Sequence, residues 1–153
     1  MKIKELMTSG VQSCGLDTNL AATAKIMWEE DCGAVPVTDQ EGVVVGVITD
    51  RDICIASATR SRLDADITVR DVISDTLYTC APSDDARAAL ETMRQRKVRR
   101  LPVVDAGGHL AGIVSIHDLA IHARSAKGAD VPAEAVLETF VAITAPTDLP
   151  VHA

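Results

Sequence analysis

The chain has 153 residues, a formal net charge of −7, 47% apolar residues and only 2% aromatic residues. A chain of this length forms one compact domain or two small ones that share a core, and with so few aromatic residues that core must consist of Val, Ile, Leu, Ala and Met. The negative charge argues against nonspecific binding to nucleic acids or anionic membranes, because such binding depends on clustered Lys and Arg.

Neither a membrane span nor a metal site is indicated by the sequence. No apolar run approaches the roughly eighteen residues of a membrane span, and residues 1–5 do not lead into a signal-peptide core, so we expect a cytoplasmic protein without a membrane partner. The cysteines form no Cys-x-x-Cys pair and no ligand set with nearby histidines, so we interpret them as small core residues in a reducing compartment. They are Cys14, Cys32, Cys54 and Cys80.

Helix and strand signals alternate along the first half of the chain. Met27 and Trp28 are assigned to the packed face of a helix that Asp17 or Thr18 caps. The almost wholly apolar run 43–48 predicts a strand covered on both faces. In chain order we expect a helical turn at 3–7, a strand at 11–14, a helix at 19–30, strands at 34–37 and 43–48, and a helix that begins within 46–52.

The second half repeats this order and then adds one more helix. We expect a turn at 69–73, a strand at 77–80, a helix at 84–96, strands at 101–104 and 109–114, and a helix at 116–123. Pro132 then suits the first turn of a last helix, which we expect to cover a core edge or a partner subunit. Its apolar face is predicted to consist of Val136, Leu137, Phe140 and Val141. The end of the chain, 145–153, has two prolines and is expected to be loosely held.

Two heptapeptides, 46–52 and 112–118, reveal an internal duplication. Each reads glycine, two β-branched residues, a hydroxyl residue, two variable residues and aspartate, which suits a strand that ends where a helix begins. A shift of 66 residues (Pro102 minus Pro36) aligns them within an ungapped match from residue 3 over 69 to residue 58 over 124. The unit is therefore duplicated. We predict a first repeat at 1–60, a linker at 61–67, a second repeat at 68–125, and a C-terminal helix and tail at 126–153.

The duplicated motif resembles that of a tandem pair of cystathionine β-synthase (CBS) domains, often called a Bateman module. Both copies match the pattern glycine, hydrophobic, any, Thr or Ser, any, any, Asp, and each begins ten residues after a Pro-Val pair. The resemblance covers about residues 1–124, and 50–53, 98–100 and 140–143 are similar to segments of small stand-alone members. It implies an α/β (α+β) fold of two βαββα repeats packed about a pseudo-two-fold, here followed by a C-terminal helix, and a homodimer.

The two motifs allow a structural and a functional interpretation. A hydroxyl residue followed three positions later by a carboxylate, as in Thr49 with Asp52 and Ser115 with Asp118, is nearly a capping box. Such a cap contributes about 1 kcal/mol without any ligand. In both copies, however, the helix start follows a glycine-bounded strand, which leaves an open N-terminus where anions bind favourably.

The resemblance implies that adenosine nucleotides bind in clefts between the repeats. Asp52 and Asp118 would accept hydrogen bonds from ribose hydroxyls, and Thr49 and Ser115 would reach the phosphate or ribose. In one cleft the first pair works with residues 76–78 and 99; in the other the second pair works with 10–12 and 33. The candidate binding residues are Val11, Gln12, Gly33, Val47, Thr49, Arg51, Asp52, Leu77, Tyr78, Arg99, Arg100, Ile113, Ser115, His117 and Asp118.

The copies differ in their positive charge. Arg99 and Arg100 are the best phosphate partners, because an arginine fork binds two oxygens at once; the alternative is a solvated basic edge. The first repeat has Gly33 and Ala34 at these positions, so the clefts should differ in affinity or in the preferred nucleotide. Tyr78 either stacks on adenine or packs within the protein.

An enzyme is not expected, because no phosphate loop, nucleophile elbow, zinc-protease motif or dinucleotide fingerprint is present. We expect a regulatory module without a required cofactor that senses AMP, ADP or ATP, with NAD or S-adenosylmethionine as options consistent with the resemblance. The ligand would bias the repeat pair, and an unidentified partner protein would respond. The alternative is a structural or protein-interaction module that kept the fold without a ligand.

Overall fold

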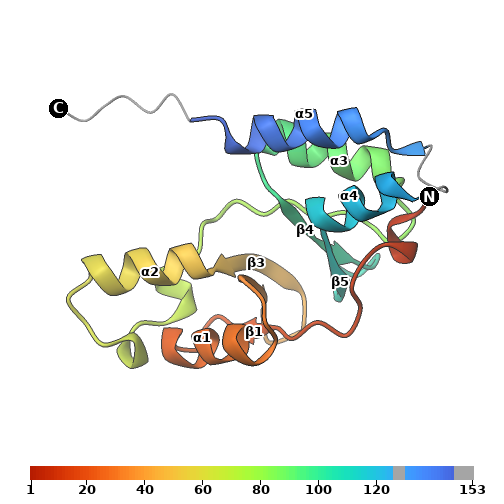
Figure 1. Cartoon of the computed structure of the whole chain (residues 1–153). Helices are drawn as coiled ribbons and strands as arrows, with labels where there is room; N and C mark the ends of the chain where they lie inside the picture. Colours follow the sequence, from red (N-terminus) through yellow and green to blue (C-terminus); the bar gives the residue numbers. More distant parts are fainter. Residues whose placement is uncertain (126–129, 147–153) are drawn as a thin grey trace.

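The computed structural model describes residues 1–125 and 130–146, and it has the mixed α/β architecture that was predicted (Figure 1). The elements are η1 (Ile3–Glu5), β1 (Cys14–Gly15), α1 (Leu20–Glu29), β2 (Ala34–Thr38), β3 (Val44–Thr49), α2 (Asp50–Thr59), η2 (Asp64–Asp66), η3 (Val69–Asp71), α3 (Ala86–Arg96), β4 (Arg100–Val104), β5 (Leu110–Ser115), α4 (Ile116–Arg124) and α5 (Ala133–Thr144). Helices α1 and α2 accompany the first sheet, and α3, α4 and α5 gather around the second (Figure 1).

The duplication in the sequence is also a duplication of strand pairing. In the first sheet β1 pairs parallel with β2, and β2 pairs antiparallel with β3. In the second sheet β4 pairs antiparallel with β5 in the equivalent register, so that Ala34 opposite Thr49 corresponds to Arg100 opposite Ser115. Both hairpins therefore deliver their hydroxyl residue to the first turn of the following helix.

The two repeats exchange their first segments. Ile3 of η1 is fully buried in the core of the second repeat, and Val69 of η3 is fully buried in the core of the first. The backbone N–H of Ile3 donates to Asp84 O at 2.9 Å, and the equivalent N–H of Val69 donates to Thr18 O at 2.8 Å. These reciprocal bonds have the symmetry of a pseudo-two-fold, and they tie each repeat to the first segment of the other.

Two expected strands are much shorter than predicted. Residues 11–13 and 77–79 are not strands; only Cys14 and Gly15 form β1, and Cys80 makes a single parallel bridge to Val103. Strand β3 also differs from its expectation, because its buried and half-buried residues alternate. One of its faces covers the core while the other is partly open, although its sequence is almost uniformly apolar.

Helix α1 corrects two further predictions. Its cap is Asn19, whose side chain accepts from the Ala22 N–H at 2.8 Å, rather than Asp17 or Thr18. Met27 is buried as expected, but Trp28 is 87% exposed. A residue next to the buried position lies about 100° further around the helix, which directs it away from the core.

Helix α5 packs beside α3 and α4 and covers an edge of the second core, as expected (Figure 1). Its buried face was predicted only in part: Val136 is buried as expected, but the second buried residue is Thr139. Thr139 is accommodated because its hydroxyl donates to Ala135 O at 2.8 Å. Leu137, Phe140 and Val141 remain 63%, 53% and 58% exposed.

Candidate functional site: two clefts between the repeats

Two clefts of similar size are each lined by residues of both repeats, and we call them cleft A and cleft B. Cleft A has a volume of about 520 Å³ and lies at the start of α2, against the segment before β4. Cleft B has a volume of about 510 Å³ and lies at the start of α4, against the segment before β2. Each cleft therefore contains the N-terminus of one helix, where partial positive charge favours an anion.

All the candidate binding residues except Asp52 line one of the two clefts. Cleft A contains Val47, Thr49, Arg51, Leu77, Tyr78, Arg99 and Arg100. Cleft B contains Val11, Gln12, Gly33, Ile113, Ser115, His117, Asp118 and again Arg100. Asp52 instead lines a separate hollow of about 140 Å³ with Ile55, Thr59 and Arg60. The two motif aspartates are thus placed differently relative to their clefts.

Both motifs form the capping boxes that the structural interpretation predicted. Oδ2 of Asp52 accepts from the Thr49 N–H at 2.9 Å, and the Thr49 hydroxyl accepts from the Asp52 N–H at 3.2 Å. Ser115 and Asp118 repeat the arrangement, with the Ser115 N–H at 2.8 Å from Asp118 Oδ2. Within the described part of the chain, Oδ1 of either aspartate accepts no hydrogen bond, so the caps leave one acceptor oxygen on each carboxylate.

The side chains that line the clefts give them opposite electrostatic character. The charged residues of cleft A are all positive: Arg51, Lys97, Arg99 and Arg100. Cleft B combines carboxylates with fewer bases: Glu30, Asp31 and Asp118 with Arg100 and His117. Lys97 of the second repeat is equivalent to Asp31 of the first, and Arg99 is equivalent to Gly33. The difference in charge between the clefts therefore arises from the side chains, because the strand register is the same in both repeats. Cleft A is therefore the better site for an anion.

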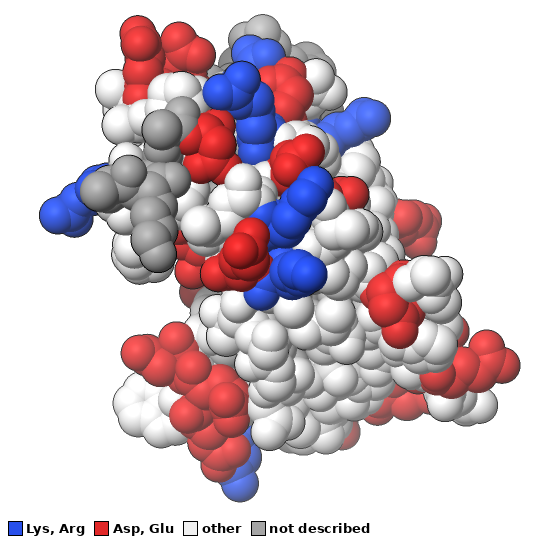
Figure 2. Space-filling model, turned by 90° about the vertical axis from the view of Figure 1, so that its right-hand side faces the viewer, with Lys and Arg blue, Asp and Glu red and all other residues white. Residues whose placement is uncertain are grey.

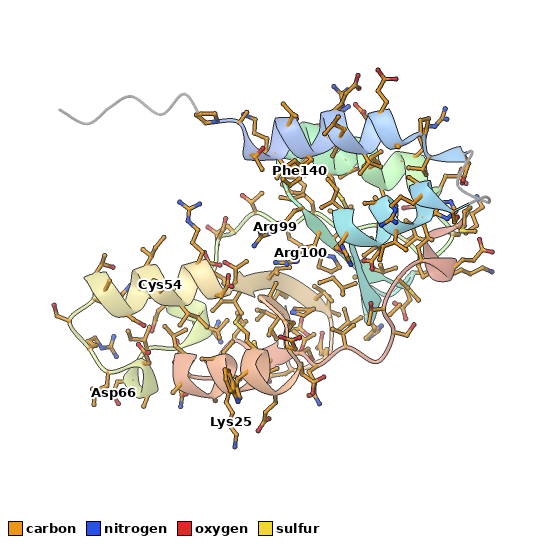
Figure 3. All side chains as sticks on the ribbon, viewed as in Figure 1. Lys25, Cys54, Asp66, Arg99, Arg100 and Phe140 are labelled. Atoms are coloured by element: carbon orange, nitrogen blue, oxygen red, sulfur yellow. The ribbon has the colours of Figure 1, made fainter. Side chains whose placement is uncertain are left out.

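Arg100 lines both clefts and lies with Arg99 in the region between the two repeats (Figure 3). Burial, and then the neighbouring Arg99 charge, lower the pKa of the Arg100 guanidinium, while Asp50 raises it. Arginine nevertheless remains protonated in proteins. A single cation is thus available to ligands in either cleft.

A family model for the CBS domain matches residues 3–59 and 69–124. The chain belongs to the CBS-domain family. It is 35% identical over 127 residues to the CBS domain-containing protein YhcV of Bacillus subtilis, covering 83% of this chain and 89% of YhcV. It is 30% identical over 146 residues to Hypoxic response protein 1 of Mycobacterium tuberculosis, covering 95% and 96% of the two chains.

Solved CBS structures have the same fold. The crystal structure of Hypoxic Response Protein I with two coordinated zinc ions has a TM-score of 0.72 at 30% identity, over 80% of this chain and 98% of that one. The CBS domain protein PAE2072 from Pyrobaculum aerophilum, complexed with AMP, has a TM-score of 0.70 at 27% identity, over 78% and 90% of the two chains. The expected resemblance to stand-alone tandem CBS proteins is confirmed.

The N-terminal segment ties down one side of the second CBS repeat. Thr8 and Ile113 exchange backbone hydrogen bonds of 2.9 and 3.0 Å. A Cβ at Gly112 would stand 2.5 Å from Thr8 O, whereas at the equivalent Gly46 it would meet only the end of the Ile73 side chain, at 3.0 Å. Main chain therefore packs against Gly112 beside cleft B, whereas the equivalent Gly46 faces a side chain that can move.

The C-terminal helix contributes to cleft A, which the sequence analysis did not anticipate. Phe140, Ile143 and Thr144 of α5 line this cleft together with Tyr78. The Arg96 guanidinium lies over the Tyr78 ring, 5.0 Å from its centroid, so one face of that ring is already occupied by a cation–π contact. The sequence did contain one indication that Phe140 is special, because it is the single phenylalanine of a chain with very few aromatic residues.

The remaining sequence expectations concern cysteines, metals and surfaces. Cys14 and Cys80 are buried as expected, and burial raises the pKa of the Cys14 thiol and raises that of Cys80 to about 12. Cys54, in contrast, is exposed. Among residues 1–125 and 130–146, no group of three or more His, Cys, Asp or Glu side chains is arranged to hold a metal ion.

The surface in Figure 2 carries charged side chains of both signs. On the face in Figure 2, Lys and Arg lie among Asp and Glu rather than gathering into one basic surface. No helix of the described residues has the length and apolar character needed to cross a membrane.

Proposed function

We propose that this protein is a stand-alone regulatory CBS module that binds an adenosine nucleotide through its phosphate in cleft A, with AMP as the first candidate. The observation that carries the proposal is the lining of cleft A, whose charged side chains are four bases and no carboxylate. PAE2072, which shares the fold at 27% identity, was solved in complex with AMP. A phosphate is the group that such a cleft favours, because its charge is opposite to that of all four bases and an arginine fork binds two of its oxygens at once.

Six residues of cleft A have a role in this proposal. Arg99 and Arg100 bind the phosphate, with the N-terminus of α2 and Arg51 as further donors. Thr49 contacts the ribose or phosphate, while Val47 and Leu77 form the apolar slot for the base. A hydrogen bond to a charged partner is worth about 1.5 to 3 kcal/mol, so two arginine contacts provide much of a micromolar affinity, which corresponds to about 8 kcal/mol.

The motif aspartates have different roles in the two clefts. Asp118 lines cleft B and has an oxygen available to accept from a ribose hydroxyl, so a nucleoside without a phosphate, or a cationic one such as S-adenosylmethionine, suits that cleft better than ATP. Asp52 lies outside the lining of cleft A, and we propose that it contributes there by holding Thr49. ADP, ATP and NAD are the competing ligands for cleft A.

We propose binding and signalling, and not catalysis, as the task of this site. The lining of cleft A has no carboxylate, histidine or cysteine, and these are the side chains that most often perform acid–base or nucleophilic chemistry. Ligand binding would stabilise one arrangement of the repeats, and a partner protein in the cytoplasm would recognise it. The cysteines, all without disulfides, are consistent with that compartment.

Titration of nucleotide-free protein tests the proposal. AMP, ADP, ATP, NAD and S-adenosylmethionine are compared in thermal-shift and calorimetric experiments. A ligand at a hundred times its dissociation constant adds about 2.7 kcal/mol, which raises the melting temperature by roughly 5 to 10 °C. Arg99→Ala should abolish most of the AMP shift, and Asp31→Ala, which removes a charge from cleft B instead, should keep it. No shift with any of the compounds would favour the ligand-free interaction module.

A homodimer is a separate proposal, supported by Trp28 on α1. This side chain is 87% exposed, and a tryptophan in water is a common anchor of protein interfaces. We expect light scattering to give a dimer for the wild type and a monomer for Trp28→Ala. Because Trp28 is the single tryptophan, its fluorescence should shift to the red on dilution. A monomeric wild type would contradict the proposal.

A further inference from the structure

We propose that α5 is a working part of cleft A, and that Phe140 packs against the base of the bound nucleotide. This inference rests on the proposed function of cleft A. Helix α5 lies outside the two segments that match the CBS domain, which end at residue 124. It nevertheless contributes Phe140, Ile143 and Thr144 to the lining of the cleft.

The packing of α5 directs Phe140 towards the cleft while leaving its ring partly uncovered. Val136 and Thr139 are 7% and 1% exposed and fix the helix on the second core. Phe140 follows Thr139 and lies on the side of α5 that faces Arg99 and Arg100 (Figure 3). Its side chain is 53% exposed. Covering a partly exposed aromatic ring with a flat group such as a base is favourable, because apolar surface is removed from water.

Phe140 is a better partner for the base than Tyr78. The Arg96 guanidinium lies 5.0 Å from the Tyr78 ring centroid, so a base would have to approach that ring from its other face. No cation–π partner occupies Phe140 among the described residues. Stacking of a base on an aromatic side chain is worth about 1 to 3 kcal/mol by alanine substitution, or roughly 5- to 150-fold in affinity.

Cleft B provides the internal contrast. Its lining contains no Phe, Tyr or Trp, and no helix equivalent to α5 follows the first repeat, where the chain continues into η2 and η3. The equivalence between the clefts is thus broken by an added element as well as by charge. Of the two clefts, cleft A alone combines an aromatic surface with several arginines, and this combination suits a nucleoside monophosphate.

Binding must then be coupled to the docking of α5. If AMP contacts both the repeats and Phe140, it stabilises α5 against the second core, and by linkage a loosened α5 lowers AMP affinity by the same factor. Binding of AMP in cleft A would thus change the stability of α5, an element that a partner protein can contact at the molecular surface. Hydrogen exchange in residues 133–144 should therefore slow when AMP is bound.

The test compares Phe140→Ala with Leu137→Ala by calorimetric titration of AMP into the full chain. Leu137 is a matched control, because it lies on the same helix, is 63% exposed and is absent from the lining of cleft A. We expect Phe140→Ala to weaken AMP binding about 5- to 150-fold and Leu137→Ala to change it less than twofold. Phe140→Trp should restore binding, because the larger ring offers the same stacking surface. Hydrogen exchange of the wild type with and without AMP gives the independent readout of coupling.

The outcomes separate this inference from the proposed function. If wild type and Phe140→Ala bind AMP equally well, the inference is wrong and the proposed function stands. Equal weakening in both alanine variants, without rescue by Phe140→Trp, would show a general effect of α5 and would also overturn the role of Phe140. If the wild type binds no nucleotide, both proposals are wrong.

Discussion

Clefts A and B derive from one duplicated unit and have volumes of about 520 and 510 Å³, yet they differ in almost every property that a ligand would sense. The backbone pairing around them is equivalent. The lining residues give cleft A four bases and no carboxylate, and cleft B three carboxylates together with Arg100 and His117. Strand register and capping thus preserve the shape of a repeat, while a few lining positions determine the charge of its cleft.

The main-chain contact at Gly112 gives the largest expected difference between the clefts. A methyl group at Gly112 would stand 2.5 Å from Thr8 O, so Gly112→Ala must displace backbone, whereas Gly46→Ala meets only the Ile73 side chain. We expect Gly112→Ala to lower the free energy of unfolding by about 3 kcal/mol and Gly46→Ala by less than about 1 kcal/mol. Urea denaturation measures both. Equal losses would mean that this main-chain contact does not distinguish the clefts.

Charge at the equivalent motif positions gives the next effect. Arg51 lines cleft A and His117 lines cleft B. Arg51→Ala should weaken AMP binding by about 1 kcal/mol, the value of an exposed charge contact, which corresponds to roughly fivefold. His117→Ala should leave AMP affinity unchanged. Calorimetric titrations at low and physiological salt would test the pair, and a larger loss in His117→Ala would assign the phosphate to cleft B.

Helix capping gives a difference of similar size that concerns stability alone. Asn19 caps α1 through a 2.8 Å bond from the Ala22 N–H, while the equivalent Asp85 makes no capping bond with its side chain. Asn19→Ala should cost about 1 kcal/mol. Asp85→Ala should cost less, because it removes only an exposed ion pair with Lys2. Thermal unfolding of the two variants provides the measurement, and the prediction fails if Asp85→Ala is the more destabilising.

The smallest effect is a pH dependence at Asp130, which lies between α4 and α5 and contacts His122 of the second repeat. Hydrogen bonds from the N-terminal amine and then from His122 lower the pKa of Asp130 from 3.8 to about 2. Because the folded-state pKa is depressed, the contribution to stability is present above about pH 4 and is lost as the pH falls towards 2. Asp130→Asn should therefore lose less stability than the wild type between about pH 5 and pH 3. Denaturation midpoints at the two pH values test this, and identical pH dependence would contradict it.

The duplicated architecture could be predicted because short stretches of sequence specify its elements. The heptapeptide of each repeat combines the end of a strand, a helix cap and a helix start. Because the two copies align without a gap, the same strand register is predicted for both. The same symmetry led to the expectation that Thr49 and Ser115 face different clefts, and the structure does place them there. Their role in binding is a proposal.

The features that were missed depend on hydrogen bonds and side-chain directions that a pattern of residue types does not specify. Thr139 was not expected in the core, because its polar group is satisfied within its own helix and this cannot be read from an apolar pattern. As a result, the predicted apolar face of α5 differed from the buried one, and Phe140 was not recognised as a residue of cleft A. The position of Asp52 outside this cleft was missed for a similar reason, since the motif gives the cap but not the direction of the remaining carboxylate oxygen.

The central claim is that cleft A is the nucleotide site, and a crystal structure of the full chain grown with AMP tests it most directly. The account predicts AMP in cleft A, with its phosphate against Arg99 and Arg100 and its base against Phe140. AMP seated in cleft B with cleft A empty would contradict the account, because it would mean that the charge difference between the clefts does not select the ligand.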